Sequence, residues 1–121
     1  MCSSDLKREF PAYWLKVHEV MSKVKDAVTA APHMHRVLFE NDRLLIVEYH
    51  GKPGDKAKMH SHPDGVLYHL EGKMKVRSIT PDGQVRELEI KPGDLMWSPA
   101  TAHALEFIEG EACRGIHIGL K

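Results

Sequence analysis

The sequence predicts an all-β sandwich or barrel preceded by an amphipathic α-helix, and three observations support this fold class. After Pro32 the chain consists of short β-rich runs separated by Pro-Gly and Asp-Gly turn signals. The turn sequence Lys-Pro-Gly-Asp occurs at 52–55 and again at 91–94, which fits a fold with a repeated half. Before residue 31, apolar residues instead recur at alternating steps of four and three, as on one face of a helix.

The expected helix runs from about residue 11 to 29. Pro11 suits its first turn, and Ala30-Ala31-Pro32 ends it. We therefore divide the chain into an N-terminal helical extension, 1–31, and a β domain, 32–121. The apolar face of this helix has two interpretations. It packs as a lid on its own domain, or it forms a dimer seam, since the spacing is nearly heptad. Its members are Phe10, Trp14, Val17, Met21, Val24 and Val28.

Nine strands are expected in the β domain, each bounded by turn residues. Many short strands at this spacing indicate a sandwich or a barrel. Pro followed by Gly favours a type II turn, so the repeated Lys-Pro-Gly-Asp sequence also fits a favourable turn that is simply used twice. The expected strands are 36–40, 44–50, 57–62, 66–71, 73–80, 85–90, 95–98, 103–108 and 113–120.

A His-x-His pair follows the first Lys-Pro-Gly-Asp turn. Residues two apart on a strand share a face, so His60 and His62 are expected to point the same way. His103, which follows the second turn, is the natural third ligand. Neutral imidazole nitrogens suit zinc, iron, copper and nickel, and manganese less selectively. The sequence therefore predicts a divalent metal site of unspecified metal at these three histidines.

These residues resemble the two motifs of the cupin superfamily. The first, Gly-x5-His-x-His-x3,4-Glu-x6-Gly, and the second, Gly-x5-Pro-x-Gly-x2-His, are matched over residues 36 to 121. More narrowly, the runs 60–64 and 96–100 are similar to small bacterial cupins of the β-alanine degradation protein-like group. The matched motif positions are Gly54, His60, His62 and Gly72, then Gly93, Pro99 and His103.

The resemblance implies a double-stranded β-helix, the cupin jelly roll, and a homodimer that pairs through edge strands. It also implies a class of chemistry, because three-histidine cupin sites hold Fe(II) in thiol dioxygenases and some diketone-cleaving enzymes.

The sequence departs from the first motif at its glutamate. Counting back from Gly72, position 65 should hold that ligand, and the chain has Gly65. Asp64 is a possible replacement ligand, although Pro63-Asp64-Gly65 also has the composition of a plain turn. In the second motif, Thr101 stands where glycine is usual. A site of three histidines without a carboxylate keeps more positive charge on the metal and favours an anionic or chelating substrate.

Several further residues are candidates for the pocket or the surface. His69 is expected to face inward as a proton donor or substrate anchor, or to be a hydrogen-bonded core histidine. Tyr68 exchanges roles with it if the register slips by one residue. Glu48 and His117 are weaker pocket candidates, and Glu106 is expected in solvent. Leu67, Met96 and Phe107 are expected to shape the pocket, whereas His33, His35 and His50 are assigned to the surface.

Three functions remain open at this level. The first is a metalloenzyme of dioxygenase-like or Lewis-acid type acting on a small carboxylate, thiol or diketone. The second is a non-catalytic module that binds a small molecule. The third is a metal-independent isomerase or cyclase that uses histidine as acid and base.

Composition restricts the remaining possibilities. The 121 residues suffice for one core, and 17 basic against 17 acidic side chains give no net charge. We therefore expect no nucleic-acid or membrane partner, because either would favour a basic excess. The chain has no apolar signal core and no run long enough to span a membrane, so a cytoplasmic location is expected. Cys2 and Cys113 are expected to be free thiols.

Overall fold

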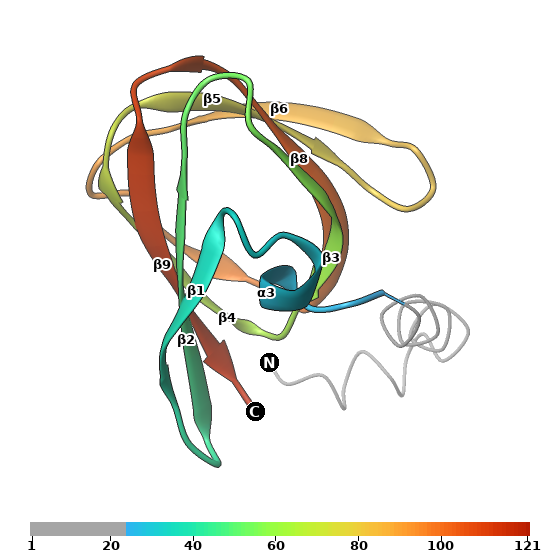
Figure 1. Ribbon diagram of the computed structural model, residues 1–121, viewed down its shortest axis with the longest axis vertical. Coiled ribbons are helices and arrows are strands. Elements are labelled where there is room, and N and C mark those ends of the chain that lie inside the picture. The colour runs from blue at the N-terminus through green and yellow to red at the C-terminus, as the bar shows by residue number, and fades with distance from the viewer. Residues whose placement is uncertain (1–23) are drawn as a thin grey trace.

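Two antiparallel sheets face each other in the computed structural model, which describes residues 24–121 (Figure 1). The all-β prediction is confirmed: all nine expected strands are present, with ends that differ by no more than two residues. The five-stranded sheet has the order β1 (His35–Glu40), β2 (Leu44–Gly51), β9 (Cys113–Leu120), β4 (Gly65–Glu71) and β7 (Leu95–Ser98). The four-stranded sheet has the order β3 (Lys56–His62), β8 (Thr101–Gly110), β5 (Met74–Ile79) and β6 (Val85–Ile90).

The predicted helix is wrong in its last part. Residues 24–26 are not helical: Val24 lies in a bend, and Asp26 is extended and forms an isolated bridge with Ser61 of β3. Only the four residues of α3 (Ala27–Ala30) are helical in the described part, and residues 11 to 23 of the predicted helix lie outside it. No helix within 24–121 combines the length and apolar character needed to cross a bilayer.

The core lies between the two sheets and also takes in the segment that precedes β1. Ala31 is fully buried and belongs to the same cluster as Met34 of the turn and Phe107 of β8. Cys113, expected to be a free thiol, is free and buried in this cluster, where burial raises its pKa to about 11. A thiol with that pKa is an inert core residue. The division of the chain at residue 31 stays a prediction.

The two Lys-Pro-Gly-Asp turns have the same geometry. The N–H of Asp55 donates to the carbonyl of Lys52 at 3.0 Å, and the N–H of Lys52 donates back to the Asp55 carboxylate at 2.9 Å. The corresponding distances in the turn at 91–94 are 3.1 and 3.0 Å. Gly54 and Gly93 have φ values of 94° and 92°, which glycine adopts without steric cost.

Each turn also docks on a strand in the same way. Gly54 N–H donates to Phe107 O on β8 at 2.7 Å, and Phe107 N–H donates to Asp55 O at 2.9 Å. In the second half, Gly93 N–H donates to His69 O on β4, and His69 N–H donates to Asp94 O, both at 2.9 Å. The repeat is therefore structural: one turn sets β3 against β8, and the other sets β7 against β4.

Candidate metal centre

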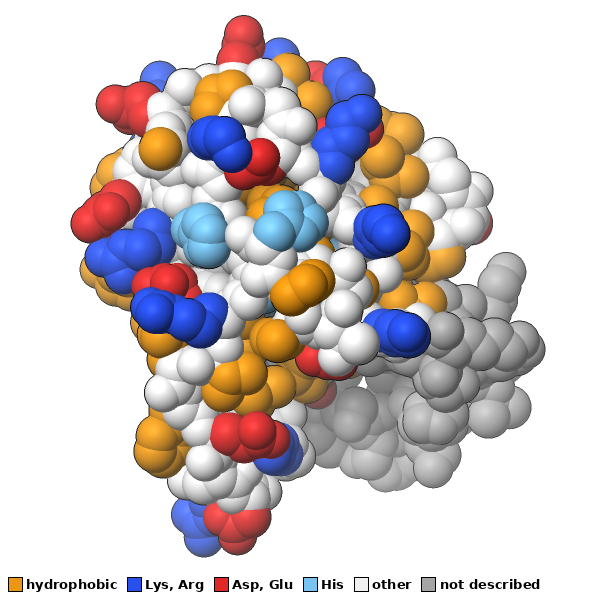
Figure 2. Space-filling view, viewed as in Figure 1, with side chains coloured by type: hydrophobic (Ala, Val, Ile, Leu, Met, Phe, Trp, Pro, Cys, Tyr) orange, Lys and Arg blue, Asp and Glu red, His pale blue; other side chains and the backbone are white. Residues whose placement is uncertain are grey.

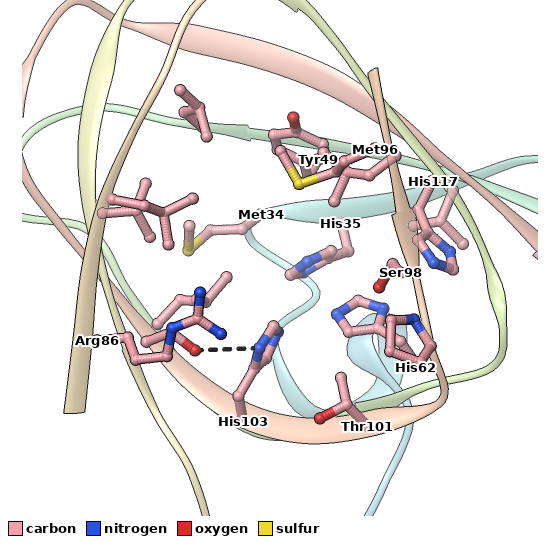
Figure 3. Close-up of a pocket in the computed structure, with 18 of the residues that line it drawn as sticks. Met34, His35, Tyr49, His62, Arg86, Met96, Ser98, Thr101, His103 and His117 are labelled. Carbon is pink, nitrogen blue, oxygen red and sulfur yellow. Dashed lines mark hydrogen bonds between the residues drawn. The ribbon is translucent and has the colours of Figure 1, made fainter. Parts of the chain in front are cut away.

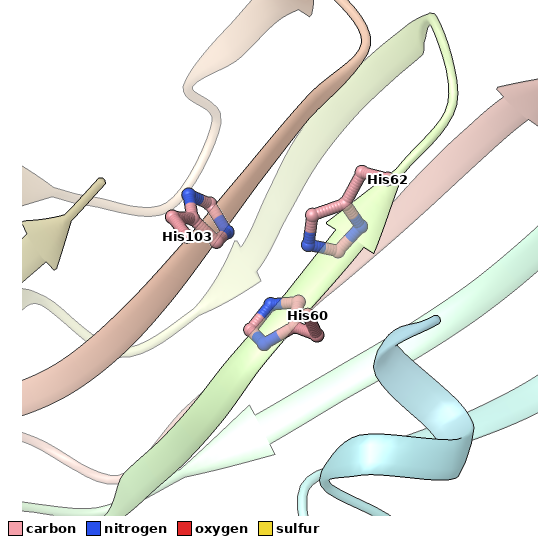
Figure 4. Close-up of side chains that lie close together, drawn as sticks. All are labelled: His60, His62 and His103. Carbon is pink, nitrogen blue, oxygen red and sulfur yellow. The ribbon is translucent and has the colours of Figure 1, made fainter. Parts of the chain in front are cut away.

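The three predicted metal ligands come together at the β3–β8 pair (Figure 4). His60 and His103 are direct partners across the two strands, and His62 follows two residues later on β3. One nitrogen from each ring lies within 4.8 Å of the other two. The ring centroids are 4.7 Å apart for His60 and His62, 4.9 Å for His60 and His103, and 5.1 Å for His62 and His103.

A strand irregularity turns His60 inward. Ala57 and His60 are both buried although they are three residues apart, and on a regular strand they would point to opposite faces. The β3–β8 register shifts between these two residues, which resets the alternation so that both face the interior. The His-x-His pair therefore points between the sheets, as its spacing predicted, because of this local shift.

The hydrogen bonds of the cluster leave two ring nitrogens without partners. Nδ1 of His60 donates to Lys58 O at 2.6 Å, so its Nε2 carries the lone pair, and this atom is buried with no partner. Nε2 of His103 is also buried and unpartnered, while its Nδ1 lies 3.3 Å from Ser78 Oγ. Buried polar atoms almost always have a partner. Imidazoles held by one nitrogen with the other free fit a bound metal ion.

The electrostatics keep the imidazoles in the form that binds metal. Burial lowers the pKa of His103 to about 3 and that of His62 well below its usual 6.5, and repulsion from neighbouring histidines adds to both effects. Burial also lowers the pKa of His60, against the opposing effect of its bond to Lys58. Burial disfavours the imidazolium, so at neutral pH the rings are neutral, as metal ligation requires.

Asp64 does not join the cluster. Its Oδ1 accepts a hydrogen bond from Ala100 N–H at 2.7 Å, and its carbonyl accepts one from Leu120 N–H at 2.7 Å. The structure therefore supports the turn interpretation of 63–65, and the three-histidine cluster contains no carboxylate.

A cavity of about 340 Å³ lies between the sheets and reaches the metal cluster (Figure 3). His62 and His103 line it at one end, and Leu67, Met96 and Phe107 line it as expected. Most other lining residues are apolar, including Met34, Val47, Val76, Leu88, Ile90 and Leu105. Arg86 is the only lysine, arginine, aspartate or glutamate among the lining residues, and Figure 3 shows its guanidinium directed into the cavity on the side of His103.

Sequence reasoning misplaced His35, which was assigned to the surface. It is only 5% exposed, lines the cavity, and lies with its ring centroid 5.2 Å from that of His60. The expected strand began at residue 36, but β1 begins at His35, opposite Tyr49. The assignments of His33 and His50 are confirmed, since both are exposed.

Burial lowers the pKa of His35 to about 4, partly offset by the bond from its Nδ1 to Ala31 O at 3.0 Å. Since a carbonyl can only accept, Nδ1 carries the proton and Nε2 carries the lone pair. His35 is therefore a neutral imidazole with a basic nitrogen beside the metal cluster.

Of the two weaker pocket candidates, His117 lines the cavity and is 4% exposed. Glu48 does not line it, so its assignment as a pocket residue was wrong. It points to the outer side of β2, where Arg36 binds it at 3.1 Å and Arg114 at 3.3 Å. Glu106 likewise pairs with Arg77, away from the metal cluster.

Neither residue proposed for proton transfer lines the cavity. Tyr68 points outward and is 38% exposed. His69 points inward but is completely buried, and both ring nitrogens are bonded: Nε2 donates to Gly72 O, and Nδ1 contacts Tyr49 Oη, each at 2.6 Å. The structure thus places His69 as a hydrogen-bonded core histidine, the alternative interpretation, because its ring has no nitrogen left for a substrate.

Comparison with known proteins identifies the fold. No protein-family model matches the sequence, and no curated protein matches it significantly. A cupin domain from Bordetella pertussis Tohama I is 20% identical, with a TM-score of 0.63 over 73% of this chain and 92% of that one. The polyketide cyclase RemF from Streptomyces resistomycificus is 26% identical, with a TM-score of 0.57 over 83% and 75%. A cupin superfamily protein from Desulfitobacterium hafniense DCB-2 is 21% identical, with a TM-score of 0.53 over 72% and 75%.

These similarities show that the chain has the cupin fold, the double-stranded β-helix that the motifs implied. They do not test the resemblance to the narrower group of β-alanine degradation protein-like cupins, so that resemblance stays a prediction.

The bond between Tyr49 and His69 makes a prediction about stability. Burial raises the pKa of Tyr49, so its hydroxyl stays protonated and donates to Nδ1 of His69. The two residues flank Gly115, whose missing side chain leaves room for the bond, since a Cβ there would lie 2.1 Å from Tyr49 Oη.

Tyr49→Phe is therefore expected to lower the free energy of unfolding by about 1–3 kcal/mol, because it leaves a buried acceptor unpaired. Urea denaturation measures this change. Tyr68→Phe, the matched control on the outer face, should change it by less than about 0.5 kcal/mol. Equal effects of the two substitutions would contradict the core role of His69.

Proposed function

We propose that the protein is a metal-dependent enzyme in which His60, His62 and His103 hold one divalent ion and a small organic anion enters the cavity. The observation that carries this proposal is the pair of buried, unpartnered Nε2 atoms in a three-nitrogen cluster. Iron, manganese, nickel, copper and zinc all remain candidates. When bound, the ion would supply Lewis acidity or, if redox-active, the O₂ chemistry of a dioxygenase.

The lining of the cavity favours one class of substrate. Its walls are mainly apolar, so the body of the substrate is apolar. Arg86 makes no ion pair with another described side chain and stands opposite Ser78 on β5, the residue that contacts His103. A guanidinium binds a carboxylate through two parallel hydrogen bonds. Among the carboxylates, thiols and diketones considered from the sequence, the position of Arg86 favours an apolar carboxylate.

A second candidate is an isomerase or cyclase that works without metal. The similarity to the polyketide cyclase RemF favours the cyclase part of this candidate, and the size and apolar character of the cavity suit an apolar substrate. In this case the free Nε2 of His35 is the base best placed to take a proton from a substrate in the cavity, since Nδ1 is held by Ala31.

We also propose a homodimer that uses the five-stranded sheet. Of the large apolar side chains that remain exposed in residues 24–121, all but Val85 lie on this sheet. Figure 2 shows apolar side chains at the surface where β1 and β2 lie, with basic and acidic groups interspersed over the rest of that face. A second copy related by a two-fold axis would cover the same residues on both subunits. These residues run from one edge of the sheet to the other: Val37, Leu38 and Phe39 on β1, Leu120 on β9, Tyr68 on β4, and Leu95 and Trp97 on β7.

The metal proposal predicts the metal content of the purified protein. Elemental analysis of protein prepared without chelators should find about one equivalent of a transition metal, and His62→Ala should lose it because one of three ligands is gone. His50→Ala, which removes an exposed histidine on β2, should keep the metal. Metal content that is low and equal in all three proteins would contradict the proposal.

Removal of the metal also separates the two candidate functions. Once a screen has identified a substrate, turnover that stops with chelator and returns with added metal supports the metalloenzyme. Turnover that survives complete metal removal, but falls in His35→Ala, would support the metal-independent isomerase or cyclase instead.

Arg86 predicts a preference that can be measured before the substrate is known. Apolar carboxylates should raise the melting temperature of the metal-loaded protein more than the matching uncharged amides, because only the carboxylate pairs with the guanidinium. Arg86→Met should abolish this preference, and Arg86→Lys should keep part of it. An unchanged preference in Arg86→Met would show that another group recognises the anion.

The dimer proposal predicts the effect of charge on the five-stranded sheet. Leu95 of the edge strand β7 is 67% exposed and lies opposite Tyr68 of β4, which is 38% exposed, so Leu95→Glu with Tyr68→Glu should leave the fold intact and convert the dimer to a monomer. Light scattering coupled to size exclusion measures the mass. Val85→Glu, at the 56% exposed apolar position on the other sheet, is the control and should remain dimeric. A dimer that survives the double substitution would exclude this edge of the sheet as the interface.

A further inference from the structure

We infer that His117 is a fourth ligand of the metal and takes the place of the glutamate that the first motif lacks. The inference rests on the proposed metal site and concerns which side chains complete it.

The first support comes from the buried polar atoms. In the part of the chain that the structure describes, three buried side-chain nitrogen or oxygen atoms have no hydrogen-bond partner, and all three are imidazole Nε2 atoms. Two belong to His60 and His103 of the cluster, and the third belongs to His117. A common cause accounts for all three, namely a single cation that is bound by every one of them.

The second support is position. His117 lies on β9, in the sheet opposite the cluster, and its ring centroid is 5.0 Å from that of His62 (Figure 3). His60 and His103 approach from the four-stranded sheet, so His117 would close the site from the other side. Its Nε2 lies outside the 4.8 Å cluster, and no hydrogen bond holds that atom in its present position.

The third support explains the departure from the motif. A Cβ at Gly65 would lie 2.2 Å from Ile118 O and 3.0 Å from Cε1 of His117, so position 65 cannot carry a glutamate here. Gly119, the partner of Gly65 across the β4–β9 pair, also borders the ring, with Cε1 at 3.5 Å from its own hypothetical Cβ. Two paired glycines thus make a slot that the imidazole occupies, next to the position where the motif has its carboxylate.

His35 is the competing candidate, and the structure favours His117 over it. The Nδ1 of His35 is bonded to Ala31, as expected for a fixed ring, but its Nε2 is not among the buried unpartnered atoms. His35 is therefore better placed to contact a substrate than to complete the ligand set.

Four neutral imidazoles have a chemical consequence. The ion keeps its full double charge, whereas a glutamate would cancel half of it. Imidazole suits zinc, copper, nickel and iron, while carboxylate suits manganese and magnesium. A site with His117 as fourth ligand should therefore discriminate against manganese, and His117→Glu should reduce that discrimination.

The experiment compares metal affinity and ligand number in the full-length protein. Competition titration with Zn²⁺ and a chromophoric chelator gives the dissociation constant, and X-ray absorption of the Zn²⁺-loaded protein gives the number of imidazoles. In His117→Ala we expect the metal to be bound by one imidazole fewer. We also expect the affinity to fall by more than the ten- to hundredfold that is typical of losing a residue that hydrogen-bonds to a ligand. His50→Ala and His35→Ala should keep the imidazole count, and His117→Glu should raise the ratio of Mn²⁺ to Zn²⁺ affinity.

The possible results distinguish a failure of the fourth ligand from a failure of the proposed three-histidine metal site. An unchanged imidazole count in His117→Ala, with affinity close to that of the parent, would overturn the inference and leave the three-histidine site standing. A parent protein that binds none of these metals would overturn the proposed function as well. If His117→Ala does not fold, as circular dichroism would show, His117→Gln fills the slot and is subject to the same two measurements.

Discussion

The pairing of β3 with β8 is the constraint on which the site depends. It sets His60 directly opposite His103, and the irregularity beside Ala57 turns the His-x-His pair toward the interior. The pairing is anchored by the first Lys-Pro-Gly-Asp turn, whose backbone is bonded to Phe107 on β8. Since each strand residue advances about 3.3 Å, a shift of one residue would separate the facing histidines and reverse their direction. The first Lys-Pro-Gly-Asp turn therefore positions the candidate metal ligands, because it fixes the register between β3 and β8.

Burial of unpaired histidines connects the site to stability. An unsatisfied buried polar atom costs about 1–3 kcal/mol, and the described residues contain three: one each on His60 and His103 of the cluster and one on His117. A cation that binds all three would remove that cost, and because it binds only the folded chain it would also stabilise the fold by mass action. The neutral rings, whose pKa values are held down by burial, make this possible at neutral pH without competition from protons. The fold thus accepts a local penalty that a ligand can relieve.

Much of this structure could be predicted from the sequence, for identifiable reasons. Strands alternate with a period of two and end at Pro-Gly and Asp-Gly turns, so all nine were located, and residues two apart share a face, so His60 and His62 were placed together. His103 followed from the repeated turn. Local pattern carries this information because each inference spans only a few residues.

What could not be predicted depends on contacts distant in sequence. His35 was wrongly assigned to the surface because β1 begins one residue earlier than expected. The pairing of His35 with Tyr49 decides where the strand begins. The core role of His69 depends on Tyr49 reaching across Gly115 from a third strand. The helix prediction failed at 24–26 because Asp26 bridges to Ser61 on β3, and no local propensity records that contact. In each case tertiary structure overrode a local preference.

Charge connects the metal cluster to the rest of the cavity. A divalent ion held by neutral imidazoles would keep both its charges, and the exposed Arg86 places a further positive charge at the wall of the same cavity. No aspartate or glutamate among the lining residues offsets them. Like charges that converge on one cavity attract an anion, and this attraction supports the proposed negatively charged substrate. Under the proposed function, the glutamate missing from the first motif and the carboxylate of the substrate are therefore related: the substrate would bring the negative charge that the three-histidine cluster does not supply.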